Sequence, residues 1–287
     1  MSSPKRPILR YHGGKWKIAS WIIAHFPQHT NYIEPFAGAA SVLLQKGRVP
    51  CEVLNDLDCR LINLFRVLQD KKQADELARR CSLTPFARAE FELSYEETED
   101  PIDQVRRLII RSFFGYGSKS CVSITKNGFR SRRADTNSPA VDWASWPTQI
   151  EMFVERLRGV VIENQDATKV IERYDRADAL FYVDPPYVHS ERNLNQGSYL
   201  YELTDEDHRE LAEALHNVEG YVIISGYPSK LYDEIYNLWP KIERKAYADQ
   251  ASPRAEVLWL SPRTAEALEK EKLPLLCGTD KDLFEHV

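Results

Sequence analysis

The sequence lacks the features of secreted, membrane-spanning and zinc-binding proteins. Its 287 residues include only five cysteines, which are scattered and form no Cys-x-x-Cys pair, so neither a disulfide framework nor a zinc cage is expected. The longest wholly apolar runs cover a few residues, whereas a membrane-spanning helix needs about 20. No apolar stretch follows the charged N-terminus, as a secretory signal would require. These absences predict a protein of the reducing cytoplasm with no membrane partner.

Several well-known site motifs are also missing. No Gly-x-Gly-x-x-Gly sequence indicates a nicotinamide cofactor, and no Gly-x-Ser-x-Gly sequence indicates acyl transfer. Gly13-Gly14-Lys15 is not part of a P-loop, because Leu9 stands at the position of the first glycine and Trp16 at that of the serine or threonine. The histidines are dispersed, and no His/Asp/Cys set has the spacing of metal ligands, so we expect no metal.

Positive charge is scarce overall but concentrated in one segment. The net charge is −5, yet residues 104–133 contain eight lysines and arginines and no acidic side chain, while the rest of the chain has 30 basic and 43 acidic groups. An ordinary solvated surface mixes both signs, whereas a phosphate backbone is met by positive charge. The segment is therefore predicted to bind nucleic acid, and the alternative is a solvated charged surface.

Seven short runs indicate the strands of a buried sheet. Most of them are rich in β-branched and aromatic residues and nearly continuous, as expected of buried parallel strands. Helical patterns lie between them at Ala39–Gln45, Leu57–Leu68 and Thr204–Leu215, the last opening with Thr204 as N-cap. This alternation predicts an α/β fold with a mostly parallel sheet, and the lack of a long helix between residues 242 and 260 favours an antiparallel pair at one end. The expected strands are Asn31–Phe36, Cys51–Asn55, Val160–Asn164, Ala179–Asp184, Gly220–Ser225, Ile242–Tyr247 and Glu256–Leu260.

The segment 70–158 interrupts this alternation. It begins with a helical pattern and then becomes rich in serine, glycine and arginine. Asn127-Gly128 favours a tight hairpin turn, across which Val122–Ile124 and Phe129–Arg130 are expected to pair. We predict an inserted, mainly helical recognition domain at 70–158, within a catalytic domain formed by residues 1–69 and 159–287. The side chains expected to bind nucleic acid are Arg111, Lys119, Lys126, Asn127, Arg130, Arg132 and Arg133.

The most specific chemical signal is Asp184-Pro185-Pro186-Tyr187, which directly follows an apolar strand. The carboxyl end of a parallel strand faces the ligand crevice of an open sheet. There the Asp184 carboxylate and the Pro185 carbonyl can both accept hydrogen bonds from one –NH₂ group, because Pro186 lacks an N–H and keeps that carbonyl out of a helix-like turn. Tyr187 offers a ring face for stacking. Together they predict a site for a nucleobase amine taken out of a duplex, and the alternative is a rigid turn that only ends the strand.

On these residues the chain resembles the Dam-type (D12 class) DNA adenine-N6 methyltransferases. The resemblance covers Pro7–Gln69 and Val160–Pro262 and is weaker in between. Besides the Asp-Pro-Pro-Tyr motif, the matching sequences are Tyr11-His12-Gly13-Gly14-Lys15 for the aromatic-x-Gly-Gly-Lys motif, Glu34–Ala39 for the methionine-binding loop, Asn55-Asp56 for the acidic motif after the second strand, and Asn164-Gln165-Asp166 for the motif near the cofactor adenine.

The resemblance implies a Rossmann-like methyltransferase sheet and a set of site residues. Lys15 is expected to meet the cofactor carboxylate or a DNA phosphate. Asp56 has separate physical support, since an acid after the second strand is placed to accept hydrogen bonds from ribose hydroxyls, and it is also suited to cap the helix 57–68. The implied catalytic residues are Asp184, Pro185, Pro186 and Tyr187, and the implied cofactor-binding residues are Tyr11, Lys15, Glu34, Phe36, Asp56, Asp166 and Asp184.

The implied activity is site-specific methyl transfer from S-adenosylmethionine to N6 of a flipped adenine in double-stranded DNA, with S-adenosylhomocysteine as product. The expected protein is a monomer of a bacterial or viral host cytoplasm and uses no metal. Three alternatives stay open: methylation of cytosine at N4, methylation of adenine in RNA, and a catalytically idle DNA-binding protein on the same scaffold.

Overall fold

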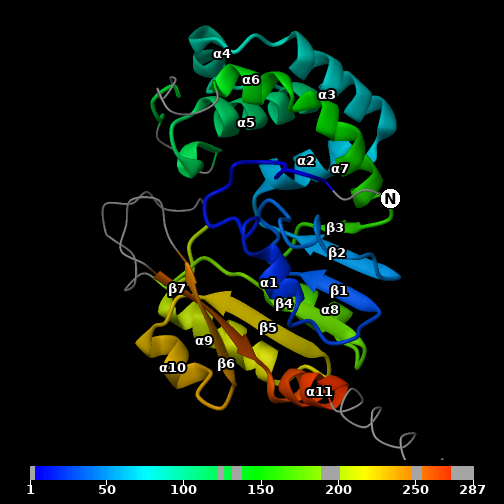
Figure 1. The fold of residues 1–287 in the computed structure, drawn as a ribbon, viewed down its shortest axis with the longest axis vertical. Coiled ribbons are helices and arrows are strands. Elements are labelled where there is room, and N and C mark those ends of the chain that lie inside the picture. Colours follow the sequence, from blue (N-terminus) through cyan, green and yellow to red (C-terminus); the bar gives the residue numbers. More distant parts are fainter. Residues whose placement is uncertain (1–3, 122–125, 131–137, 189–200, 247–253, 273–287) are drawn as a thin grey trace, which may run out of the picture.

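Seven strands form one sheet within the part of the chain that the structure describes. The structure is a computed structural model and describes residues 4–121, 126–130, 138–188, 201–246 and 254–272. The strand order is β3-β2-β1-β4-β5-β7-β6 (Figure 1). The predicted strands are confirmed to within two residues at each end. Their bounds are β1 (Asn31–Glu34), β2 (Cys51–Asn55), β3 (Val161–Glu163), β4 (Ala179–Val183), β5 (Tyr221–Gly226), β6 (Lys241–Ala246) and β7 (Arg254–Leu260).

The strand directions determine which residues meet at the ligand-binding edge. β3, β2, β1, β4 and β5 are mutually parallel, so their carboxyl ends share one edge of the sheet. β7 is antiparallel to both β5 and β6, which confirms the predicted antiparallel pair. Gly226, the last residue of β5, is paired with Val257, the middle residue of β7, so the residues before Val257 extend to or past that end of β5. The first residues of β7 therefore lie at the same edge as the carboxyl ends of the parallel strands.

Side chains along the strands alternate between two hydrophobic cores, one on each face of the sheet. On β4, for example, Leu180 and Tyr182 belong to the first core, whereas Phe181 and Val183 belong to the second. This burial on both faces explains why a central strand such as β4 is apolar without interruption. The first core is covered by α1 (Ala19–Ile23), α2 (Cys59–Gln69) and α11 (Pro262–Lys272), and the second by α8 (Ala167–Tyr174), α9 (Asp205–His216) and α10 (Lys230–Ile235).

The predicted helix starts are partly confirmed. Thr204 and Asp207 form a capping box at the start of α9, as expected. The helix α2 instead begins at Cys59 and is capped by Asp58, whose side chain accepts a hydrogen bond from the backbone N–H of Arg60 at 2.9 Å. The prediction that Asp56 caps this helix is therefore wrong, because the chain makes one further turn after β2.

The expected helix Ala39–Gln45 is also wrong. This segment consists of turns, since Gly38 and Ala40 both have φ of +50°, which no α-helix allows. A Cβ on Gly38 would stand 3.1 Å from the ring of Tyr11, a tight contact, and the positive φ also favours glycine there. The tight turn brings backbone N–H groups to the edge of the sheet.

A helical segment between β2 and β3 lies beyond the β3 end of the sheet (Figure 1). Its aromatic side chains, including Phe91, Phe114 and Trp146, belong to the same first core as Leu54 and Tyr182 of the sheet. The segment therefore packs continuously onto the sheet through α2. After α2 it comprises α3 (Lys71–Leu83), α4 (Arg88–Leu93), α5 (Pro101–Phe114), η1 (Ser118–Cys121), α6 (Pro139–Ala144), η2 (Pro147–Gln149) and α7 (Ile150–Leu157).

The backbone around Asn127-Gly128 pairs with the end of α5. Phe129 forms an antiparallel bridge with Gly115, and the N–H of Tyr116 donates to the carbonyl of Gly128 at 2.8 Å. Val122–Ile124, the other expected arm of the hairpin, lies outside the described residues. The hairpin stays a prediction.

Candidate active site

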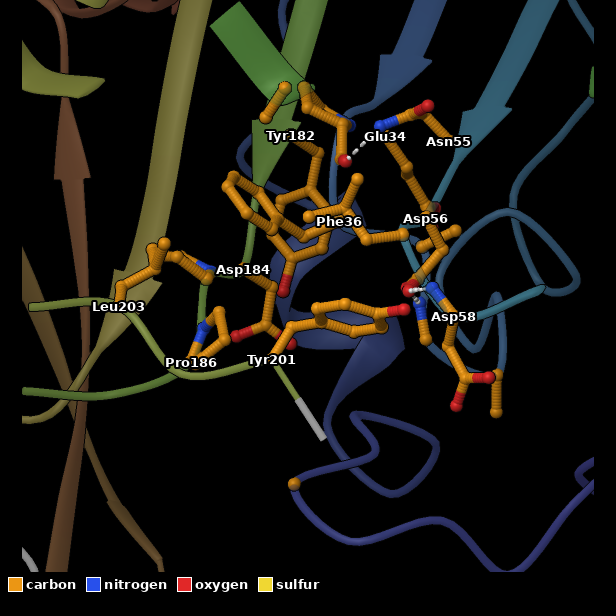
Figure 2. Close-up of a pocket in the computed structure, with 18 of the residues that line it drawn as sticks. Glu34, Phe36, Asn55, Asp56, Asp58, Tyr182, Asp184, Pro186, Tyr201 and Leu203 are labelled. Atoms are coloured by element: carbon orange, nitrogen blue, oxygen red, sulfur yellow. Dashed lines mark hydrogen bonds between the residues drawn. The ribbon is translucent and has the colours of Figure 1, made fainter. Parts of the chain in front are cut away.

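One pocket at the carboxyl edge of the sheet contains all the side chains that the sequence assigns to catalysis or cofactor binding. They come from the N-terminal loop and from the ends of β1, β2, β3 and β4, and Figure 2 shows Glu34, Phe36, Asp56 and Asp184 around it. Parallel strands end together, so motifs far apart in the sequence meet there. The predicted residues that line the pocket are Tyr11, Lys15, Glu34, Phe36, Asp56, Asp166, Asp184, Pro185, Pro186 and Tyr187.

Glu34, at the end of β1, holds the turn that follows the strand. Its Oε1 accepts hydrogen bonds from the Tyr32 hydroxyl at 2.7 Å and from the backbone N–H of Leu43 at 2.8 Å. The side chain is 2% exposed, and this burial raises its pKa to about 7. Its carboxylate thus accepts hydrogen bonds from groups of the protein itself, and it shapes the pocket wall by fixing the turn.

Asp56, after β2, is held by two backbone groups. Its Oδ2 accepts a hydrogen bond from Gly38 N–H and its Oδ1 from Asp58 N–H, both at 2.9 Å. Burial raises the pKa of Asp56 to about 6, and the two N–H groups limit the rise. Each oxygen keeps a further acceptor site, so the carboxylate can also bind hydroxyl groups of a ligand.

The ends of the neighbouring strands are tied together beside Asp56. The amide nitrogen of Asn55 donates to the carbonyls of Pro35 and Gln165, each at 2.9 Å, and so joins the loops after β1, β2 and β3. Asp166 caps α8 by accepting a hydrogen bond from Thr168 N–H at 2.9 Å. The positions of Asp56 and Asp166 are therefore set by backbone contacts.

Asp184, after β4, forms an ion pair with Lys15. The Nζ atom of Lys15 lies 2.7 Å from Oδ1 and 2.8 Å from Oδ2, and the Ser225 hydroxyl donates to Oδ1 at 2.9 Å. Tyr182 supports Ser225 through a 2.8 Å hydroxyl–hydroxyl hydrogen bond. Lys15 is only 5% exposed. The structure thus places this cation against the Asp184 carboxylate, a contact that the sequence did not predict.

The hydroxyl of Tyr187 also has a buried partner. It donates to Oε1 of Glu256, from β7, at 2.9 Å, and burial raises the pKa of Tyr187 well above its usual range, so the phenol stays protonated. The ring packs against Tyr227, with centroids 4.5 Å apart, and Lys15 Nζ lies 4.9 Å from its centre. These contacts hold the ring at the pocket wall.

Sequence reasoning missed two residues that line the pocket, Tyr201 and Leu203, and two that contact its lining residues, Ser225 and Glu256. Ser225 and Glu256 lie inside two of the predicted strands, where a buried acid is the only unusual feature that could have drawn attention to Glu256. Tyr201 and Leu203 precede α9, and Figure 2 shows both beside the Asp184 side of the pocket. No local motif marks these four positions, because their neighbours around the pocket come from distant parts of the sequence.

Three predicted DNA-binding residues lie around Tyr95 in the helical segment. The guanidinium of Arg111 lies 5.7 Å and the Nζ of Lys126 5.6 Å from the centre of this ring, and Asn127 N–H donates to its hydroxyl at 3.3 Å. Arg111 also donates to the backbone carbonyl of Ser94 and is half-buried. The structure thus brings these three residues together around the ring of Tyr95.

The basic block is not uniformly available to a partner. Asp103, one residue before it, accepts hydrogen bonds from Arg106 and Arg107 at 2.6 Å each, and Arg106 also pairs with Glu90 at 3.0 Å. The positive footprint expected from residues 104–133 is therefore reduced by acidic neighbours just outside it.

Of the other basic candidates, the structure describes the side-chain contacts of Arg130 alone. Arg130 lies 3.6 Å from the carboxylate of Asp142. Arg132 and Arg133 lie outside the described residues, as does the side chain of Lys119.

The described residues contain no group of three His, Cys, Asp or Glu side chains placed to hold a metal ion. Among the same residues, no helix is long and apolar enough to cross a membrane.

An α/β sheet whose carboxyl edge carries a cofactor-type pocket and an Asp-Pro-Pro-Tyr sequence defines a methyltransferase that acts on an amine. The model of the D12 class N6 adenine-specific DNA methyltransferase family matches residues 11–248, and the chain belongs to this family. It therefore methylates adenine at N6 in DNA. The family match favours this activity over methylation of cytosine, methylation of RNA and a non-catalytic role.

Proteins named DNA adenine methylase are similar to the chain over most of its length. The protein of Haemophilus influenzae is 27% identical over 256 residues, covering 81% of this chain and 83% of its own length. That of Serratia marcescens is 29% identical over 252 residues, covering 80% and 87%. That of Escherichia coli K12 is 24% identical over 243 residues, covering 80% and 84%.

Proposed function

We propose that the pocket binds S-adenosylmethionine next to an adenine that has been flipped out of double-stranded DNA. The observation that carries this proposal is the meeting of five separate sequence motifs in one pocket at the carboxyl edge of the sheet. When bound, this cofactor supplies an electrophilic methyl group on a sulfonium.

The residues in the pocket fit such a cofactor. Asp56 and Asp166 present acceptors for hydroxyl and amino groups, and Tyr11 and Phe36 present aromatic surfaces. Gly38 lines the pocket and packs directly against the Tyr11 ring, which a Cβ on Gly38 would meet at 3.1 Å. We assign Tyr11, Glu34, Phe36, Asp56 and Asp166 to the cofactor side, with Glu34 acting through the turn that it holds.

Asp184, Pro185, Pro186 and Tyr187 form the side of the pocket that receives the base. The Asp184 carboxylate and the Pro185 carbonyl accept hydrogen bonds from the adenine –NH₂ group, which directs the nitrogen lone pair away from the ring. Tyr187 stacks on the base, and its ring is already fixed by Glu256 and Tyr227. Catalysis rests mainly on positioning and on electrostatics.

In this proposal the protein is a monomer and binds the DNA duplex through its helical segment. Lys126 and Asn127, beside Tyr95, are part of the proposed binding surface. Arg111 and Arg130 contribute from the same segment, and Lys119, Arg132 and Arg133 complete the proposed set. Their role is to contact phosphates and base edges while the adenine enters the pocket.

The variant Asp184→Ala tests the assignment. Methyl transfer to plasmid DNA from a methylation-free host should be abolished, because the lost acceptor matters most in the transition state, while binding of S-adenosylhomocysteine should fall less. Transfer is measured with tritiated S-adenosylmethionine and binding by calorimetry. Asp75→Ala, on the exposed surface of α3, serves as control. Turnover of Asp184→Ala within about tenfold of the wild type would contradict the role of Asp184.

A further inference from the structure

A cation is shared by two carboxylates at the base side of the pocket. Lys15 Nζ lies 2.7 Å from Asp184 Oδ1 and 3.6 Å from Glu256 Oε1. The side chains of Lys15 and Glu256 are each 6% exposed. A buried charge is stable only when it is paired and hydrogen-bonded, so the three groups depend on one another.

The described side-chain contacts of Glu256 are with residues on the base side of the pocket. It accepts the hydroxyl hydrogen of Tyr187 at 2.9 Å and faces Lys15, and both of these residues line the pocket. Burial raises the pKa of Glu256, Lys15 opposes the rise, and the charge of Asp184 adds to it. An acid in a buried strand is costly, and this one connects β7 to the residues of the Asp-Pro-Pro-Tyr motif.

The acceptor sites of Asp184 explain why a second anion is useful. Oδ1 accepts hydrogen bonds from Lys15 and Ser225, and Oδ2 accepts another from Lys15. A carboxylate has about four acceptor sites, so most are occupied before an adenine amine arrives. Glu256 lies close enough to Lys15 to take over part of its attraction when the amine binds.

We propose that Glu256 is a positioning residue for methyl transfer, with two connected effects. It fixes the ring of Tyr187 through the hydroxyl, and it shares Lys15 with Asp184 so that Asp184 can accept the target amine. The inference rests on the proposed function, because it takes Asp184 as the acceptor of that amine.

The variant Glu256→Gln tests this role. The amide keeps the length and an acceptor for Tyr187 but removes the charge that attracts Lys15. We expect kcat to fall at least tenfold, while the KM for DNA and the affinity for S-adenosylhomocysteine change less than threefold. Glu243→Gln, an exposed position on β6, is the matched control and should keep wild-type kcat. A kcat of Glu256→Gln within twofold of the wild type would overturn the proposal.

Two further variants separate positioning from folding. Glu256→Asp restores the charge and should recover part of the kcat lost in Glu256→Gln, whereas equal loss in both would overturn a role of the charge. Tyr187→Phe removes only the hydroxyl. The double variant with Glu256→Gln should lose less than the product of the two single losses, because the amide is a weaker acceptor than the carboxylate and both changes therefore weaken the same contact. Fully independent losses would count against the contact.

The same assays distinguish this inference from the proposed function. Retained turnover in Asp184→Ala contradicts the function assigned to the pocket. Loss of turnover in Asp184→Ala together with wild-type kcat in Glu256→Gln contradicts only the role of Glu256.

Discussion

The carboxylates of the pocket have different environments although they lie at the same edge of the sheet. Glu34 has a pKa raised to about 7 and accepts hydrogen bonds from Tyr32 and Leu43, whereas Asp184 forms an ion pair with Lys15. Asp56 is intermediate, with a pKa raised to about 6 and backbone donors on both oxygens. The function of each acid therefore follows from its neighbours and not from its residue type.

Cofactor affinity should depend on pH through Asp56. Because burial raises its pKa to about 6, the carboxylate is ionised above that value and becomes protonated as the pH falls through it. A protonated acid is a weaker acceptor for ribose hydroxyls, so at pH 5 the affinity for S-adenosylhomocysteine should be lower by about fivefold to tenfold than at pH 7.5. Calorimetric titrations between pH 5 and 8 measure this change.

Asp56→Asn is the control for the pH experiment. It should bind S-adenosylhomocysteine more weakly than the wild type at pH 7.5 and show a smaller change between pH 5 and 8. An equally large change in the variant would assign the pH dependence to another group, such as Glu34.

At the scale of elements, a buried ion cluster joins the helical segment to the sheet. Glu52 of β2 is 3% exposed and receives hydrogen bonds from Arg156 of α7, at 2.6 and 2.9 Å, and from Lys46 at 3.3 Å. Arg156 and Lys46 are also buried. One acid therefore balances two cations at the junction of β2 and α7.

Glu52→Gln should destabilise the protein strongly. The substitution leaves two buried cations without their anion, which costs about 3–5 kcal/mol of unfolding free energy. Urea denaturation followed by circular dichroism measures the change, and Glu151→Gln, an exposed position on the same helix α7, should remain within about 0.5 kcal/mol of the wild type. A loss below about 1 kcal/mol in Glu52→Gln would show that the cluster does not stabilise this junction.

At the scale of the whole molecule, the first hydrophobic core extends from the sheet into the helical segment. Buried residues of α3, α5 and α7 belong to the same core as those of β1 and β4. The helices are thus held in a fixed position relative to the pocket edge. The positive charges of the basic block are not all available at the surface. Arg106 and Arg107 are paired with Asp103 within the fold, whereas Lys126 is exposed.

This difference predicts which cations bind DNA. Lys126 is exposed, and Lys126→Ala should reduce the slope of log affinity against log salt by about 1 if it contacts a phosphate. Arg107 is bonded to Asp103 and to the carbonyls of Leu93 and Glu96, so Arg107→Ala should leave the slope unchanged and lower stability instead. Binding of duplex DNA at several salt concentrations measures the slopes.

Arg130→Ala distinguishes phosphate contact from base reading. A base-reading arginine should cost about 1–3 kcal/mol on the methylated site and relax the preference at one position, which sequencing of methylated DNA would show. If Lys126→Ala and Arg130→Ala both match the wild type in salt slope and in site preference, the proposed recognition surface is wrong.

Much of the fold and of the pocket was predictable from sequence because the signals are local. Continuous apolar runs mark buried strands, and the residues that follow β1, β2, β3 and β4 meet at one edge in any parallel sheet. The Asp184–Tyr187 motif likewise carries its chemistry within four neighbouring residues. The turns that begin at Gly38 were not predictable, since the N–H of Gly38 donates to Asp56 after β2 and the N–H of Leu43 donates to Glu34 at the end of β1.

Tertiary structure alone decided the partners of these residues. Lys15 reaches Asp184 across 169 positions of sequence. Glu256 reaches Tyr187 because β7 runs antiparallel to β5, which puts the start of β7 at the edge where the parallel strands end. Pairing between distant strands leaves no mark on either stretch of sequence, since it is fixed by the register and direction of the whole sheet.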